Sequence, residues 1–135
     1  MKQYSAKDIR NVVLTGHGDS GKTSLAEAML FLAGATDRLG KVADGNTVCD
    51  FDPEEIKRKT SVSTAVAPLE WLNKKINVID TPGLFDFAGG LCEGFRAAEL
   101  AVIVVSGKTG ASVGAEKGYQ AAQKRGIPKY FFVSR

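Results

Sequence analysis

The sequence predicts an α/β domain with a mostly parallel sheet, helices on both faces and an antiparallel hairpin at one edge. Two observations support this fold class. Apolar runs of strand length alternate with helix patterns along the chain, and this alternation favours a mostly parallel sheet. The first apolar run, residues 9–15, also leads directly into a glycine-rich stretch that precedes a helix pattern. Strand, glycine loop and helix in this order are typical of a phosphate-binding loop.

The glycine-rich stretch satisfies the spacing G-x-x-x-x-G-K-[ST]. In such a loop the backbone N–H groups surround a di- or triphosphate, and the helix N-terminus adds its partial positive charge. Lys22 is predicted to reach the outer phosphates, and Thr23 to offer its hydroxyl to magnesium. Glycines are required because a Cβ would collide with the phosphate oxygens. The stretch comprises Gly16, His17, Gly18, Asp19, Ser20, Gly21, Lys22 and Thr23.

The three glycines of this stretch also satisfy G-x-G-x-x-G, the fingerprint of a dinucleotide-binding turn. That turn needs an acidic residue about 20 positions on, at the end of a second strand, and Asp37 lies at about this offset. The residues around Asp37 have no strand pattern, however, and a dinucleotide turn has no use for Lys22 and Thr23. An NAD-binding oxidoreductase is therefore the weaker alternative.

The composition is that of an ordinary globular chain, with 135 residues, 44% of them hydrophobic and 24% charged. A net charge of +3 is too small to favour a membrane or sequence-specific nucleic-acid binding. Cys49 and Cys92 lie far apart and in no metal-ligand spacing, so inert reduced thiols are expected. Without an apolar signal segment or an apolar run of 18 residues, we expect a cytoplasmic protein.

After the loop, Leu25, Met29 and Leu32 recur at helical spacing and predict a helix with this face inward. Residues 35–59 lose the pattern, so a long irregular connection is expected. Such segments are uncommon in compact domains unless they are functional, which leaves both a floppy insertion and a ligand-ordered switch segment open. The acidic stretch at residues 50–55 is interpreted as a solvated turn.

A hairpin is predicted next. Residues 62–69 alternate in hydrophobicity, and Pro68 confines this strand to the edge of the sheet. A turn at residues 73–74 leads into a second strand that ends before Asp80. An acid at the carboxyl end of an apolar strand can orient magnesium or its water shell, and the N–H of Gly83 can hydrogen-bond a γ-phosphate. The phosphate loop upstream favours this interpretation over a plain turn.

The remaining elements continue the alternation. Residues 100–105 form a continuous apolar run typical of a central parallel strand, and residues 130–133 predict a last strand. Large aromatic residues are interpreted as core or switch packing, namely Trp71, Phe85, Phe87 and Phe95. Apolar residues at helical spacing predict two further helices, with Leu91, Phe95 and Ala98 inward in the first and Ala115, Tyr119 and Ala122 inward in the second.

Three stretches together resemble the N-terminal GTP-binding domain of translation elongation factor G, and divergent elongation-factor-G-like proteins most of all. They are GHGDSGKTS at residues 16–24, RKTSVSTAV at 58–66 and INVIDTPGLFDF at 76–87. The resemblance covers essentially the whole chain. It implies a P-loop GTPase that binds GTP and Mg²⁺ and hydrolyses GTP to GDP and phosphate on the ribosome.

The resemblance also implies roles for single residues. Residues Asp19 to Ser24 would hold the phosphates, and Asp19 would also help to seat a monovalent cation. Asp80 and Gly83 match the family's magnesium-side acid and γ-phosphate contact. Thr23 would ligate magnesium together with the family's switch threonine, which aligns best with Ser61, with Thr60 one register away.

Leu84 departs from the family pattern, because it occupies the place of a histidine that helps to align the attacking water. Leucine offers no donor or acceptor, and losing a positioned polar group commonly costs about 10²–10³ in rate. Binding can survive such a loss while turnover suffers. The alternative is therefore a nucleotide-dependent ribosome-binding protein with little or no hydrolysis. His17 matches a loop histidine of the family and is expected to pack, so no catalytic residue is assigned.

A second departure concerns Ser134 and Arg135, which fall where the family's Asn-Lys-x-Asp motif begins. The aspartate of that motif reads the guanine base, so guanine selectivity is implied here by the resemblance alone. We expect residues 1–135 to be the N-terminal portion of a GTP-binding domain, cut inside this motif. Residues 130–133 would then form an exposed apolar edge that makes the chain marginally stable or prone to associate.

Overall fold

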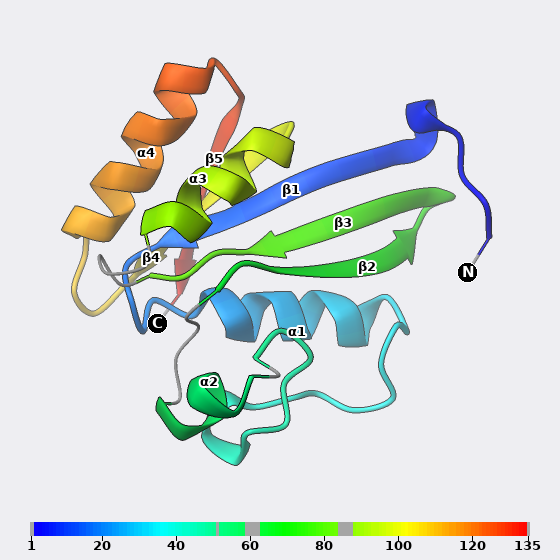
Figure 1. The fold of residues 1–135 in the computed structure, drawn as a ribbon, viewed down its shortest axis with the longest axis horizontal. Coiled ribbons are helices and arrows are strands. Elements are labelled where there is room, and N and C mark those ends of the chain that lie inside the picture. Colours follow the sequence, from blue (N-terminus) through cyan, green and yellow to red (C-terminus); the bar gives the residue numbers. More distant parts are fainter. Residues whose placement is uncertain (1, 51, 59–62, 84–87, 135) are drawn as a thin grey trace.

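The computed structural model describes residues 2–50, 52–58, 63–83 and 88–134, and the description of residues 88–91 is limited to their backbone. The described residues form a five-stranded sheet with helices on both faces (Figure 1). The strands are β1 (Ile9–Gly16), β2 (Ala65–Trp71), β3 (Lys74–Asp80), β4 (Leu100–Ser106) and β5 (Lys129–Ser134). The helices are α1 (Lys22–Leu32), α2 (Pro53–Arg58), α3 (Ala88–Ala97) and α4 (Val113–Arg125), with short 3-10 helices at Ala6–Asp8 and Val42–Asp44.

The strand order is β2-β3-β1-β4-β5, and only the β2–β3 pair is antiparallel. This confirms the predicted α/β sheet with an antiparallel edge hairpin. Leu72 and Asn73 both have positive φ, as the two central residues of a tight hairpin turn require. Pro68 lies on edge strand β2, as predicted, where a missing N–H costs no ladder hydrogen bond. The strand begins at Ala65 rather than at residue 62.

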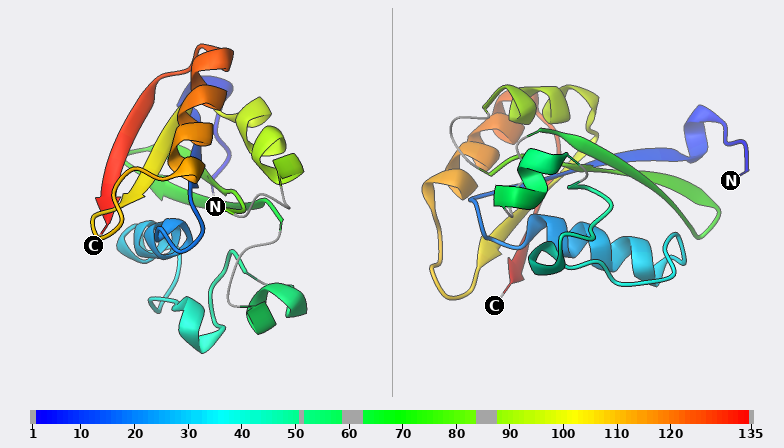
Figure 2. Two further views of the ribbon diagram at one scale, coloured as in Figure 1. Left: turned by 90° about the vertical axis from the view of Figure 1, so that its left-hand side faces the viewer. Right: turned by 60° about the horizontal axis from the view of Figure 1, so that its bottom comes forward.

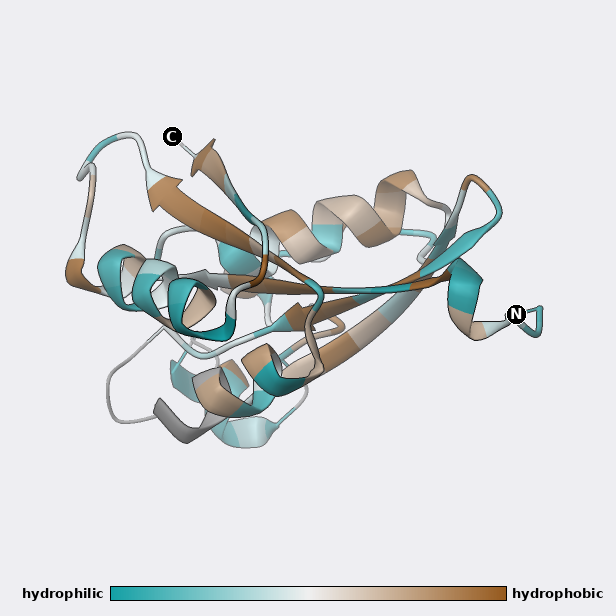
Figure 3. Cartoon of the chain, turned by 90° about the horizontal axis from the view of Figure 1, so that it is seen from above, coloured by the Kyte–Doolittle hydropathy of each residue, from teal (hydrophilic) through white to brown (hydrophobic). Residues whose placement is uncertain are grey.

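The core forms on both faces of the sheet because β1 alternates its side chains between them. Leu14 packs with α1 and the hairpin, whereas Val13 packs with α3 and α4 (Figures 1 and 2). Strand β4 is likewise buried on both sides, which explains its continuous apolar run. Figure 3 shows the hydrophobic colour along the central strands and much of the polar colour along α4. Phe95 is 2% exposed, so its predicted core role is confirmed.

Two predicted helix faces were only partly right. On α1, Leu25 and Met29 are partly buried and pack against the core as predicted, but Leu32 is 74% exposed. The buried residues of this helix are Lys22, Thr23, Ala26, Glu27 and Leu30. On α4, Ala115 and Ala122 are buried as predicted, whereas Tyr119 is 42% exposed and stacks on Phe131 of β5, with ring centroids 6.2 Å apart. Its place against the sheet is taken by two glycines. A Cβ at Gly118 would lie 2.6 Å from the Thr15 side chain, and a Cβ at Gly114 would collide with the backbone of His17.

The connection between α1 and β2 is more ordered than predicted. It contains a 3-10 helix and α2, and it lies on the α1 side of the sheet (Figures 1 and 2). The acidic stretch at residues 50–55 is not a solvated turn, because Asp50 is 5% exposed and Glu55 is fully buried. Ser63 donates its hydroxyl to Glu55 Oε1 at 2.8 Å, which gives one oxygen of this buried carboxyl group a partner.

Two surface predictions had opposite outcomes. Trp71 lies at the end of the hairpin and is 45% exposed, so its core assignment was wrong. Strand β5 is an edge strand with exposed Tyr130, Phe131, Phe132 and Val133, as predicted. Of the helices within the described residues, none is both long and apolar enough to cross a membrane.

Candidate phosphate-binding site

The glycine loop joins β1 to α1 and takes backbone conformations that favour glycine. Gly16 has φ 151°, and a Cβ there would collide with the carbonyl oxygen of Val104. Gly21 has φ 99° and precedes the first residue of α1. Within the loop, the backbone N–H of Ser20 donates to the carbonyl of His17 at 3.2 Å. The chain therefore curls tightly at the N-terminus of a helix, where an anion is stabilised.

Lys22 is the buried cation of the loop. Its side chain sits in the first turn of α1, and Nζ donates to the carbonyl oxygen of His17 at 2.9 Å. Burial lowers the pKa of Lys22, and the carboxylates of Asp80, Asp19 and Asp50 oppose this shift. An anion bound in the loop would oppose it further, because an opposite charge favours the ammonium form.

Thr23 and Asp80 bring the two predicted halves of the site into contact. The parallel pairing of β1 with β3 sets Leu14 opposite Asp80, so both strands end beside the loop. The Thr23 hydroxyl then donates to Asp80 Oδ2 at 2.6 Å, inside the protein. Burial raises the pKa of Asp80 to about 6, although the Thr23 hydrogen bond and the Lys22 charge work against this.

Two buried oxygens at this point have no hydrogen-bond partner within the described residues. They are Asp80 Oδ1 and Ser20 Oγ. A buried carboxylate oxygen without a donor is costly, and a hard cation would satisfy it. The described residues contain no group of three His, Cys, Asp or Glu side chains suited to a metal. This donor set fits Mg²⁺, which is usually held by one or two protein ligands plus phosphate oxygens and water.

Gly83 closes the site from the second loop. A Cβ at this residue would lie 2.5 Å from Lys22 Nζ and 2.6 Å from the backbone nitrogen of Gly18. Only a residue without a side chain leaves that space open. The backbone amide of Gly83 therefore lies close to the lysine and the loop, in a cradle suited to a phosphate group.

The structure brings most of the predicted site together. Its clustered members are Gly16, Gly18, Ser20, Gly21, Lys22, Thr23, Asp80 and Gly83. His17, Asp19 and Ser24 belong to the same loop and helix start, but they are exposed. The main chain of His17 lies against Gly114, although the residue as a whole is exposed. The assignments to Thr60, Ser61, Leu84, Phe85 and Phe87 lie outside the described residues.

The dinucleotide alternative lacks the strand that it needs. Residues 33–41 are all described, and Asp37 is an exposed residue in a stretch without a strand. The next strand, β2, pairs antiparallel to β3, whereas the dinucleotide fold continues with a parallel one. This geometry favours the phosphate loop.

One contact at the loop was not predicted. Ser134 Oγ donates to the carbonyl oxygen of Ser20 at 2.6 Å. The parallel pairing of β4 with β5 sets Ser134 opposite Ser106, at the same sheet edge where β1 ends. The sequence could have indicated this contact, because parallel strands bring their carboxyl ends to one edge of a sheet and Ser134 directly follows the last predicted strand.

Comparison with known proteins agrees with this geometry. Residues 7–135 match the family model described as the elongation factor Tu GTP binding domain. The chain is 41% identical over 127 residues to an elongation factor G-like protein of Mycobacterium tuberculosis, covering 94% of the chain and 18% of the relative. It is 37% identical over 138 residues to a mitochondrial ribosome-releasing factor 2 of Yarrowia lipolytica, covering 99% and 17%.

A solved structure shares the same fold. A crystal structure of a Thermus thermophilus protein superposes with a TM-score of 0.90 at 40% identity, covering 93% of this chain and 19% of that one. The chain thus spans less than a fifth of the length of each of these three proteins.

Proposed function

Because the chain belongs to the elongation factor Tu GTP binding domain family, we propose that it is the N-terminal portion of the GTP- and Mg²⁺-binding switch domain of an elongation-factor-G-like translational GTPase. The contact between Thr23 and Asp80 carries this proposal. It sets the loop hydroxyl and the strand-end carboxylate side by side, with a free carboxylate oxygen and the amide of Gly83 nearby.

Each residue of the site then has a role. Backbone N–H groups of residues 18–24 surround the phosphates, and Lys22 neutralises charge on the outer ones. Thr23 and Asp80 hold Mg²⁺, with Ser61 as a further ligand from the switch segment. When bound, Mg²⁺ would supply positive charge that neutralises the phosphates. Asp19 is exposed at the mouth of the loop, where it helps to seat a monovalent cation.

The switch follows from which residues contact the terminal phosphate. A γ-phosphate would hold Gly83 and the segment around Ser61. Hydrolysis of GTP, which removes the γ-phosphate, would release them. Ordering and release of such segments is a common way for nucleotide hydrolysis to change a protein's shape. In the whole protein the ribosome is the proposed partner, and the name of the ribosome-releasing factor relative supports it. The cytoplasm is the proposed location.

Nucleotide binding by the full-length protein is the first test. Affinities for GTP, GDP, ATP and NAD are measured with and without Mg²⁺. We expect tight, Mg²⁺-dependent binding of guanine nucleotides only, and its loss in Lys22→Ala. Equal binding of ATP, or NAD binding that survives Lys22→Ala, would overturn the proposal. Exchange of Lys124 for alanine gives a control, because this exposed lysine lies near the C-terminal end of α4, and it is the N-terminal end of that helix that meets the loop.

Turnover is a separate question, because Leu84 stands where the family has a histidine. The second candidate function is a nucleotide-dependent ribosome binder with little hydrolysis. Phosphate release stimulated by ribosomes is compared between the unmodified protein and Leu84→His. A rise of about 10²–10³ in the variant, from a negligible rate, would favour the second candidate, since that is the usual effect of one positioned polar group. Fast release by the unmodified protein would exclude it.

A further inference from the structure

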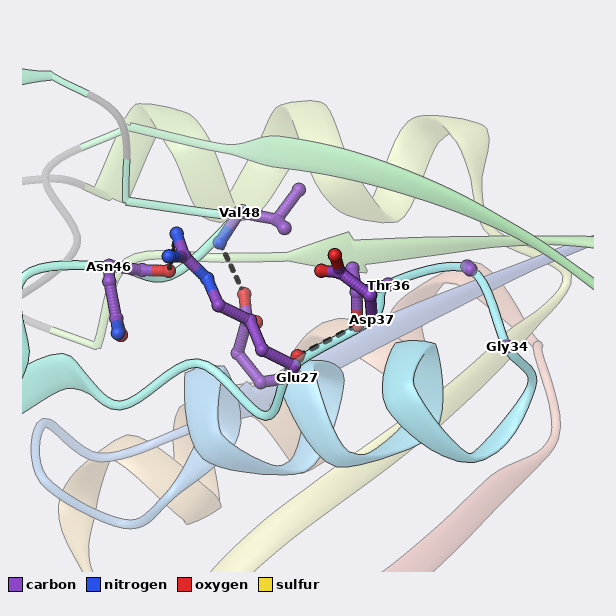
Figure 4. Close-up of a pocket in the computed structure, with 8 residues that line it drawn as sticks. Glu27, Gly34, Thr36, Asp37, Asn46 and Val48 are labelled. Atoms are coloured by element: carbon purple, nitrogen blue, oxygen red, sulfur yellow. Dashed lines mark hydrogen bonds between the residues drawn. The ribbon is translucent and has the colours of Figure 1, made fainter.

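Glu27 is a buried carboxylate that neither the phosphates nor the metal would contact. It lies on α1, one helical turn after Thr23, and it is 1% exposed. It also lines a cavity of about 550 Å³ between the end of α1 and the connection that follows (Figure 4). A buried carboxylate needs donors, and Glu27 finds them in the backbone of that connection.

The donors are two consecutive amides. The N–H of Val48 donates to Glu27 Oε1 at 2.5 Å, as Figure 4 shows, and the N–H of Cys49 lies 3.4 Å from the same oxygen. The Val48 side chain is 48% exposed, whereas Cys49 is 1% exposed and packs in the core with Ala26 and Leu30 of α1. At Val48 the carboxylate of Glu27 holds the backbone, because hydrogen bonds to a charged acceptor are stronger than neutral ones.

The connection also passes the other side of the same carboxylate. A Cβ at Gly40 would lie 2.5 Å from Glu27 Oε2 and 3.0 Å from the carbonyl oxygen of Asn46. Gly40 is not among the residues with positive φ, so close approach is what requires glycine here. The backbone near residues 40 and 48 therefore encloses Glu27 from two sides.

The backbone segment that Glu27 holds, residues 48–49, is followed by a residue that acts on the phosphate site. Asp50 follows Cys49 and is 5% exposed. Its charge acts on both Lys22 and Asp80, and the charge of Glu27 also reaches Asp80. Hydrogen bonds thus link Glu27 of α1 to the two amides, and Asp50, the next residue, acts on the site through its charge.

We propose that Glu27 is a positioning residue that fixes residues 47–50 to α1 and thereby favours GTP over GDP. This inference rests on the proposed function. If the segment around Ser61 is ordered by a γ-phosphate, as proposed above, its ordering entropy must be supplied by GTP binding. Because the hydrogen bond from Val48 to Glu27 already fixes the backbone at residue 48, fewer residues remain to be ordered when GTP binds. Removing this hydrogen bond would then raise the cost for the GTP state alone, because in the proposed switch only the γ-phosphate orders that segment.

The experiment measures dissociation constants of the full-length protein for GDP and for a non-hydrolysable GTP analogue, both with Mg²⁺. In Glu27→Ala we expect the affinity for the GTP analogue to fall about tenfold, a typical coupling factor, and the affinity for GDP to stay within about twofold. Glu27→Gln keeps the Oε1 acceptor and should recover most of the preference. Gly40→Ala pushes on the same carboxylate and should act as Glu27→Ala does.

Asp37→Ala is the matched control, because Asp37 is an exposed carboxylate that lines the same cavity. It should leave both affinities unchanged. Equal losses for GDP and the GTP analogue in Glu27→Ala would overturn the inference and assign Glu27 a purely structural role. If Glu27→Ala does not fold, the ratio of the affinity for the GTP analogue to the affinity for GDP is measured in Gly40→Ala and Glu27→Gln instead. A lowered ratio in Gly40→Ala and a nearly normal one in Glu27→Gln would support the inference. An unmodified protein that binds neither nucleotide would refute the proposed function itself, before any variant is compared.

Discussion

The Thr23 hydroxyl donates to Asp80 Oδ2 across 2.6 Å and joins two stretches that lie 57 residues apart in the sequence. Thr23→Ala would leave this buried carboxylate without its donor and remove a proposed magnesium ligand. We expect the Mg²⁺-dependent part of GDP affinity to fall at least about tenfold, as for other metal-site residues. Thr23→Ser keeps the hydroxyl and should lose little. GDP titrations with and without Mg²⁺ check this, and an unchanged Mg²⁺ effect in Thr23→Ala would contradict it.

Gly83→Ala tests the closeness of the two loops. The added methyl would meet Lys22 Nζ at 2.5 Å and the nitrogen of Gly18 at 2.6 Å. One loop must move, and forcing extra volume into a packed site typically costs about 1–3 kcal/mol. We expect nucleotide affinity to drop by about tenfold or more, with a smaller effect on thermal stability. Calorimetric titration together with a melting curve separates the two, and unchanged affinity would show that the loops do not meet.

The stability of α2 should depend on pH through Glu55. Burial and the neighbouring Asp50 raise the pKa of Glu55 to about 7, from an ordinary value of 4.5. The folded state therefore holds the proton more tightly than the unfolded state. This contribution to stability is complete below pH 4.5 and is lost as the pH rises to about 7.

Glu55→Gln removes that dependence, because the amide mimics the protonated acid and can still accept from Ser63. Between pH 4.5 and 7, the opening free energy of residues 52–58 should fall in the unmodified protein by up to about 1.4 kcal/mol per pH unit relative to the variant. Hydrogen exchange measures this. Glu54→Gln, an exposed neighbour, is the control and should keep the slope. Parallel pH profiles for Glu55→Gln and the unmodified protein would refute the assignment.

The exposed edge strand β5 should make the 135-residue chain associate. Val133 is 68% exposed on this strand, and unpaired apolar edges are templates for pairing with other chains. Val133→Lys places a charge on the edge and should shift the chain toward the monomer in sedimentation experiments. Lys124→Ala, an exposed change on α4, should not. A sharp melt of a monomer, independent of concentration, would argue against association in the unmodified chain.

The strands and the phosphate loop could be predicted because their signals are local. An apolar run, a glycine spacing and a proline at the sheet edge each depend on a few neighbouring residues. The Thr23–Asp80 contact followed from the same signals, since strand ends in a parallel sheet share one edge. The assignments to Ser61 and Leu84 remain predictions.

The buried carboxylates could not be predicted in the same way. Asp50 and Glu55 look like surface residues in the sequence, because charge normally keeps a side chain in water. Their partners, such as Ser63 for Glu55, are supplied by the tertiary fold. On α4 the prediction for Tyr119 was wrong for a related reason, since hydrophobic periodicity does not count glycine as a contact residue.

Those glycines of α4 have a consequence for sequence variation in the family. Gly114 and Gly118 are one helical turn apart and admit the backbone of His17 and the side chain of Thr15 directly against the helix. We therefore expect these two positions, which would not touch the nucleotide, to be about as constrained as the loop that would bind it. In a saturation library selected for nucleotide binding, residues 114 and 118 should tolerate almost no replacement, while the exposed Glu116 between them should vary freely. In relatives whose loop sequence has changed, two glycines four residues apart on this helix would then show that the backbone of the loop still packs against it.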